Sequence, residues 1–176
     1  MAGPVITMPK KKHTAPDLPA DDESFRAIRA LGATLAAHRD GDSSGALVAL
    51  ADVITIASHD GEHAARHRLA WLSTALATMT AEQRLRGQPR AGGPWAIDAN
   101  AGPVPFDDLP EPERVALTAV VTSMNGDDDG ATHLLHEYAH TTGAAAIAET
   151  LANLVVMHTR AQVTRTGAHR RPDDTD

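Results

Sequence analysis

The sequence predicts an all-α fold, a six-helix bundle made of two related three-helix halves joined by a long Pro/Gly-rich loop. First, apolar residues recur at intervals of three and four along most of the chain, which is the helical period. Second, Ala, Leu and Val supply most of the apolar residues, whereas the aromatic residues that strands favour make up only 3%. Third, short Gly-Asp segments separate the periodic stretches. A chain of 176 residues is long enough to enclose one core.

The composition divides the chain into five segments. Residues 1–20 contain four prolines and are predicted to form a disordered tail, as are residues 166–176. The first three-helix half spans 21–86 and the second spans 113–165. Between them, residues 87–112 contain six prolines and four glycines and form the connection.

Three helices are predicted in the first half. They cover 22–39, 46–58 and a third segment that is capped by Asp60 and ends near Gly87. Residues 53–56 are all β-branched, which is typical of a strand. Ala and Leu surround them, however, and a helix is favoured. The residues that carry the helical spacing are Phe25, Ile28, Leu31 and Leu35, then Leu47, Leu50, Val53 and Ile54, then Ala65, Leu69, Leu72, Leu76 and Met79.

The second half repeats this pattern. Helices are predicted around 117–124, over 131–141 and over 144–165. The first loop of each half begins with Gly-Asp and ends with Gly-Ala, at 41–46 and again at 126–131. We therefore infer a tandem duplication in which each half covers the apolar face of the other. Ala-rich helices joined by Gly-Asp turns also resemble one another without common origin.

Composition and charge exclude several classes of function. The chain contains no Cys, which rules out disulfides and thiolate metal sites. It has no secretory signal and no apolar stretch that spans a bilayer, so we expect a cytoplasmic protein that does not bind membranes. The net charge of −7 argues against nucleic-acid binding, except through the basic tails. Thirteen Arg against three Lys, with abundant Ala, is typical of a GC-rich bacterial source.

Large apolar residues interrupt the polar connection. Trp95, Ile97 and Phe106 are predicted to anchor this segment to the body and to form an interaction surface. Because no complete catalytic set accompanies them, the first hypothesis is a non-catalytic helical module without a cofactor, which binds another protein or itself. A regulator that binds a small molecule or a nucleic acid is a weaker hypothesis.

The alternative hypothesis is a zinc-dependent metallohydrolase. His136, Glu137 and His140 form an H-E-x-x-H, in which two imidazoles one helical turn apart bind zinc and the glutamate acts as general base. The pentapeptide resembles that of the zincin metallohydrolases, and this resemblance implies a third ligand, for which Glu149 and His158 are the candidates. The longer metzincin pattern has a glycine three residues after the second histidine, and Gly143 occupies that position. Three residues later that pattern has a third histidine, whereas this chain has Ala146.

Helical projection argues against this alternative. His133, His136, Glu137 and His140 lie opposite the apolar residues of their helix, which predicts a solvated polar face. A second group, His59, His63 and His67, has the same i, i+4 spacing, and packing of the halves about a twofold axis would bring it together with the first. A buried His158 is more typical of a hydrogen-bonded core residue than of a ligand. Residues 127–129 fit a helix cap better than a calcium loop.

Overall fold

The structure is a computed structural model that describes residues 22–86, 95, 97 and 104–167. Within these residues all regular structure is helical, which confirms the predicted all-α class. None of the helices found there combines the length and apolar character needed to cross a membrane. The helices are α1 (Asp22–Arg39), α2 (Ser43–Ala57), α3 (Glu62–Leu85), the 3-10 helix η1 (Phe106–Asp108), α4 (Glu111–Met124), α5 (Asp128–Thr142) and α6 (Ala144–Gly167).

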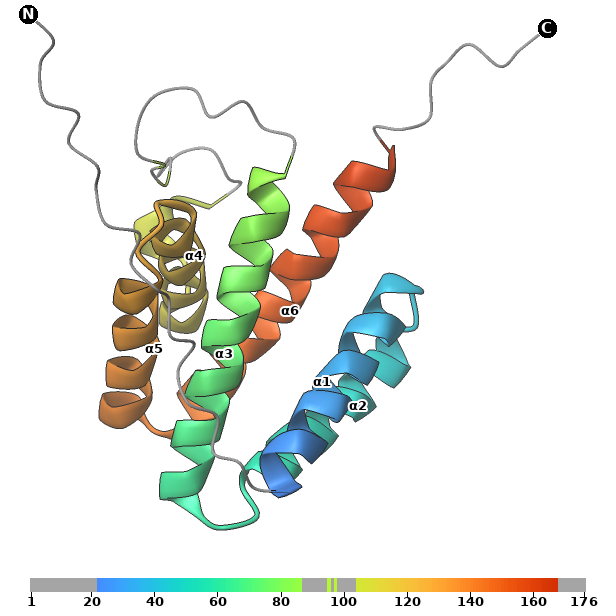
Figure 1. Ribbon diagram of the computed structural model, residues 1–176, viewed down its shortest axis with the longest axis vertical. Coiled ribbons are helices and arrows are strands. Elements are labelled where there is room, and N and C mark those ends of the chain that lie inside the picture. The colour runs from blue at the N-terminus through green and yellow to red at the C-terminus, as the bar shows by residue number, and fades with distance from the viewer. Residues whose placement is uncertain (1–21, 87–94, 96, 98–103, 168–176) are drawn as a thin grey trace, which may run out of the picture.

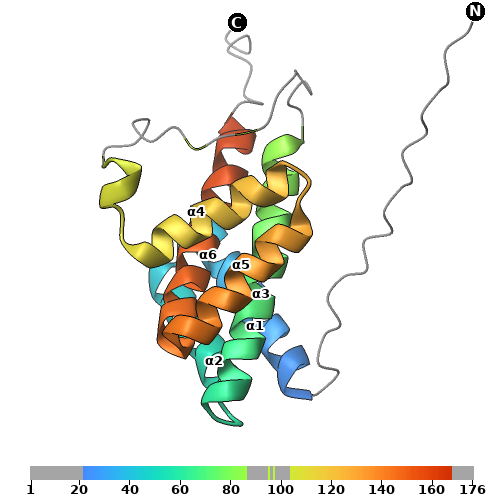
Figure 2. The same ribbon diagram turned by 90° about the vertical axis from the view of Figure 1, so that its left-hand side faces the viewer.

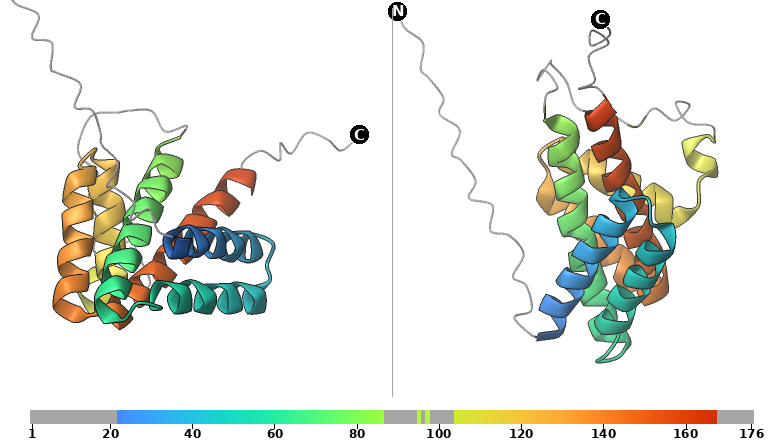
Figure 3. Two further views of the ribbon diagram at one scale, coloured as in Figure 1. Left: turned by 60° about the horizontal axis from the view of Figure 1, so that its bottom comes forward. Right: turned by 90° about the vertical axis from the view of Figure 1, so that its right-hand side faces the viewer.

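The six α-helices pack as three layers of two. The longest helices, α3 and α6, lie side by side in the middle layer (Figure 1). The α4–α5 pair covers one side of this layer and contacts both of its helices (Figure 2). On the other side, α1 and α2 form a hairpin that packs mainly on itself and touches the middle layer through fewer residues (Figure 3). Among the described residues, no further layer covers the outer face of this hairpin.

Aspartate caps start α2 and α5. The Asp42 carboxylate accepts a hydrogen bond from the backbone N–H of Gly45 at 2.8 Å, and Asp127 accepts one from Gly130 at 2.9 Å. These caps place both glycines inside the first turn. The predicted starts of α2 and α5, at residues 46 and 131, are therefore three residues too late.

Asp60 does not cap α3 as predicted. The residue at the N-cap is Gly61, which has no side chain to accept from the free N–H groups there. The Asp60 carboxylate instead accepts a hydrogen bond from the buried Arg68 guanidinium, which also donates to the Ala57 carbonyl at 3.3 Å. The hydrogen bond from Arg68, with a smaller one from His59, holds the pKa of Asp60 below its ordinary value. Arg68 thus ties the end of α2 to α3.

The core is built from small and medium side chains. Alanine accounts for many of the buried positions in α3 and α4, which lets the helix backbones approach closely. The predicted inner stripe of α3 is confirmed from Ala65 to Leu76, but Met79 is exposed. Phe25 and Leu47 are exposed as well, because α1 and α2 turn other residues inward. The buried residues of these two helices are Ser24, Ala27, Leu31 and Thr34 in α1 and Ala46, Val53 and Ala57 in α2.

Two segment boundaries differ from the prediction. Helix α4 begins at Glu111, before the predicted boundary at 113, since Pro112 lies in its first turn, where the missing N–H of proline would have no helical partner. The last helix extends to Gly167, two residues into the predicted tail. The remainder of both predicted tails, and most of the connection over 87–103, lie outside the described residues.

Candidate functional site

The predicted interaction surface on the connection is partly buried. Ile97 and Phe106 are half-buried, and Trp95 is moderately exposed. The backbone N–H of Trp95 donates to the Asn125 side chain at 2.6 Å, and the Asn125 amide donates back to the Trp95 carbonyl at 2.9 Å. This pair of hydrogen bonds joins the connection to the end of α4, as expected for an anchored segment.

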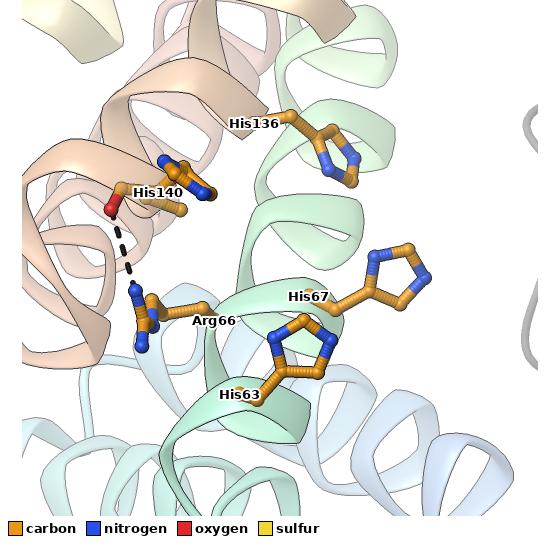
Figure 4. A pocket seen from close by; sticks show the side chains of 6 residues that line it. His63, Arg66, His67, His136 and His140 are labelled. Carbon is orange, nitrogen blue, oxygen red and sulfur yellow. Dashed lines mark hydrogen bonds between the residues drawn. The ribbon is translucent and has the colours of Figure 1, made fainter.

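Two pairs of histidines meet between α3 and α5. His63 and His67 lie one turn apart on α3, and His136 and His140 lie one turn apart on α5 (Figure 4). Together with Arg66 and Ala139 they line a small open pocket of about 100 Å³. The sequence raised this convergence for a twofold arrangement of the halves, and the structure brings four of the predicted histidines together. His59 and His133 do not line the pocket.

The rings of His67 and His136 contact each other at the edge of α3 and α5. Their centroids lie 5.4 Å apart with an angle of 60° between the planes. Burial, together with the nearby His67, lowers the pKa of His136 below its ordinary value. A neutral imidazole presents a free nitrogen lone pair, which is the form that binds a metal ion.

Two charged residues of α3 fix the pocket in place. Glu62 accepts a hydrogen bond at 2.8 Å from the backbone N–H of Ala144, one of the free groups at the start of α6. Arg66 donates to the His140 carbonyl at 3.3 Å, in the last turn of α5 (Figure 4), and its Nε lies 3.4 Å from Glu62. The first turn of α3 is thereby tied to the junction of α5 and α6.

The predicted third zinc ligands lie elsewhere. His158 contacts Thr80 near the end of α3, thirteen residues beyond His67, which is roughly 20 Å along the helix axis. Glu149, in α6, lies near Tyr138. Tyr138 is on the face of α5 opposite to His136, so Glu149 is remote from the pocket. In the part of the chain that the structure describes, no three His, Asp or Glu side chains are placed to hold a metal ion together. Glu137 is exposed and does not line the pocket.

His158 is a hydrogen-bonded core residue, as expected. Only 5% of its surface is exposed, and its Nδ1 lies 3.1 Å from the Thr80 hydroxyl oxygen. That hydroxyl donates its single proton to the Leu76 carbonyl at 2.7 Å, so the His158 ring is the donor and carries its proton on Nδ1. Burial lowers the pKa of His158 below its ordinary value.

The lowered pKa of His158 makes the fold sensitive to acid. A histidine ionises near pH 6.5 in the unfolded chain but at a lower pH in the fold, so its contribution is complete above about 6.5 and is lost as the pH falls below that value. We expect the free energy of unfolding of the wild type to fall as the pH falls below about 6.5. The H158Q variant should reduce the slope of this fall by up to about 1.4 kcal/mol per pH unit. Urea unfolding of both proteins between pH 7.5 and 5.0 measures this difference, and equal slopes would contradict it.

The outward face of α2 is an apolar surface that the sequence interpretation missed. Leu47 and Val48 are 68% and 65% exposed, and Ala51 and Thr55 continue the same face one and two turns later. Asp52, at its edge, is the only charged residue in α2. A helix that is apolar all round is normally buried. The signal was present in the sequence, because Asp52 is the only charged residue of α2, and the error lay in assigning Leu47 to the inner face.

Comparison with protein-family models, with curated proteins and with solved structures finds no match.

Proposed function

We propose that this protein is a non-catalytic helical module that associates with a second copy of itself through the outward face of α2. The observation that supports it is the exposure of Leu47 and Val48 on a helix whose only charged residue is Asp52. Burying apolar surface gains roughly 25 cal/mol per Å², so a second apolar helix placed on this face is favourable. An apolar face of this kind on the outside of a fold is typical of an association surface.

We choose a second copy as the occupant because the α2 face itself carries almost no charge. The α2 face, with Asp52 as its one charge, offers little with which to select a charged partner. Two copies of this chain repel each other through their net charge of −7, and an almost uncharged face is where they approach with the least repulsion. A twofold axis across α2 then places the same residues of both copies in contact.

Sedimentation velocity over a range of protein concentrations tests the proposal. We expect the wild-type chain to convert from monomer to dimer as concentration rises, and V48E to remain monomeric, because a carboxylate at the contact is buried without a partner. Val48 is exposed within one chain, so the fold tolerates this change. Circular dichroism checks that V48E keeps the wild-type helix content.

A matched control uses the other helix of the hairpin. Ala33 is exposed on α1, whose outward side also carries Arg26 and Arg29, so A33E adds the same charge to a surface that is already polar. We expect A33E to dimerise as the wild type does. A wild-type chain that stays monomeric throughout, or equal loss of dimer in A33E and V48E, overturns the proposal.

We also infer that the two halves are a tandem duplication and that the protein acts in the cytoplasm. Two pairs of glycines support the duplication: Gly41 and Gly126 have φ of 80° and 79°, and Gly61 and Gly143 have φ of 90° and 96°. Each pair occupies the same place between helices in its half, in a conformation that favours glycine. The lack of Cys is in keeping with a reducing compartment.

A further inference from the structure

We propose that His67 and His136 bind one divalent transition-metal ion, such as Zn²⁺ or Ni²⁺, as a clip between α3 and α5. His63 or His140, with water, completes the coordination. This site is independent of the self-association proposed above, since it uses other helices and other residues. It also differs from the predicted hydrolase site, because it needs neither Glu137 nor a ligand from α6.

The spacing of the two rings suits a shared ion. Two imidazoles that bind one tetrahedral ion through nitrogens at about 2.0–2.1 Å have centroids roughly 5 Å apart. The centroids of His67 and His136 lie 5.4 Å apart without any rearrangement. Figure 4 shows that the two rings lie next to each other and come from different helices. Imidazole nitrogen is a preferred ligand of Zn²⁺, Ni²⁺ and Cu²⁺.

The remaining ligands lie one helical turn away on the same two helices. His63 and His140 are exposed, so their rings change rotamer rapidly and at little cost. Such rotation is required, because the described side chains as placed offer no three-residue site. The positive charge of Arg66 opposes a cation in this pocket, but Glu62 lies 3.4 Å from the Arg66 Nε and offsets it. The pocket of about 100 Å³ leaves room for an ion and water.

Isothermal titration of the chelator-treated full chain with Zn²⁺ tests the site. We expect one ion per chain and a melting temperature that rises with Zn²⁺ concentration, because the ion binds the folded chain. Replacing one of the two ligands, in H67Q or H136Q, should weaken binding by roughly tenfold or more. Co²⁺ provides a second readout, since its visible absorption reports nitrogen coordination and should be lost in the same variants.

H133Q is the matched control, since His133 is exposed on α5 but does not line the pocket. We expect it, and likewise V48E, to bind Zn²⁺ as the wild type does. Absence of saturable binding, or equal weakening in H133Q and H67Q, overturns the site. If H136Q does not fold, the exposed His67 still decides the question, because H67Q changes a surface residue and should keep the wild-type melting temperature without metal.

Discussion

Replacing Leu151 by Ala is expected to lower the free energy of unfolding by about 3 kcal/mol, the largest loss among the changes considered. Leu151 is fully buried in α6, which packs along α3 in the middle layer. Truncation removes three carbons from the core and leaves a cavity that the surrounding helices refill only in part, and such changes cost about 2–5 kcal/mol. Urea unfolding followed by circular dichroism measures the loss as a lower midpoint with an unchanged slope.

The same substitution at Leu47 is the control. This residue lies on the outward face of α2, so L47A removes the same atoms without opening a cavity and should change the free energy of unfolding by less than about 0.5 kcal/mol. Both variants are measured at low protein concentration, where mass action keeps the chain monomeric. A loss below about 1 kcal/mol for L151A would mean that the α3–α6 contact is not closely packed.

Helices with regular spacing could be predicted closely from the sequence. The bounds of α1 match the predicted 22–39, because acidic residues at its start and a Gly-Asp turn after it leave little choice. The starts of α2, α4 and α5 were set too late for one physical reason. Gly45, Pro112 and Gly130 were counted as loop residues, yet the first helical turn tolerates all three when its N–H groups are capped or not needed.

The candidate site could be predicted only in part. The i, i+4 spacing of His136 and His140, and of His63 and His67, placed each pair on one helix face. Which faces meet depends on how α3 and α5 pack, and apolar spacing within a single helix does not contain that information. The exposure of Phe25 and Leu47 has the same cause, since α1 and α2 bury other residues, such as Leu31 and Val53, in their place.

Enlarging a buried alanine is the second change with a large expected effect. Ala77 lies in α3, which packs against α4, α5 and α6, and no part of it is exposed. Leucine there adds three carbons to a position with no free space, so side chains leave their rotamers or a helix shifts. We expect A77L to lower the free energy of unfolding by about 2 kcal/mol, and urea unfolding measures it.

A33L separates crowding from the effect of the residue type. Alanine and leucine have similar helix propensities, and Ala33 is exposed on α1, so A33L should change the free energy of unfolding by less than about 0.5 kcal/mol. A loss confined to A77L means that the cost comes from forcing closely packed helices apart. An A77L protein as stable as A33L would contradict this, because it requires a middle layer loose enough to admit a leucine. Such a layer would not hold the rings of His67 and His136 at a fixed separation, and the metal site argued above depends on that separation.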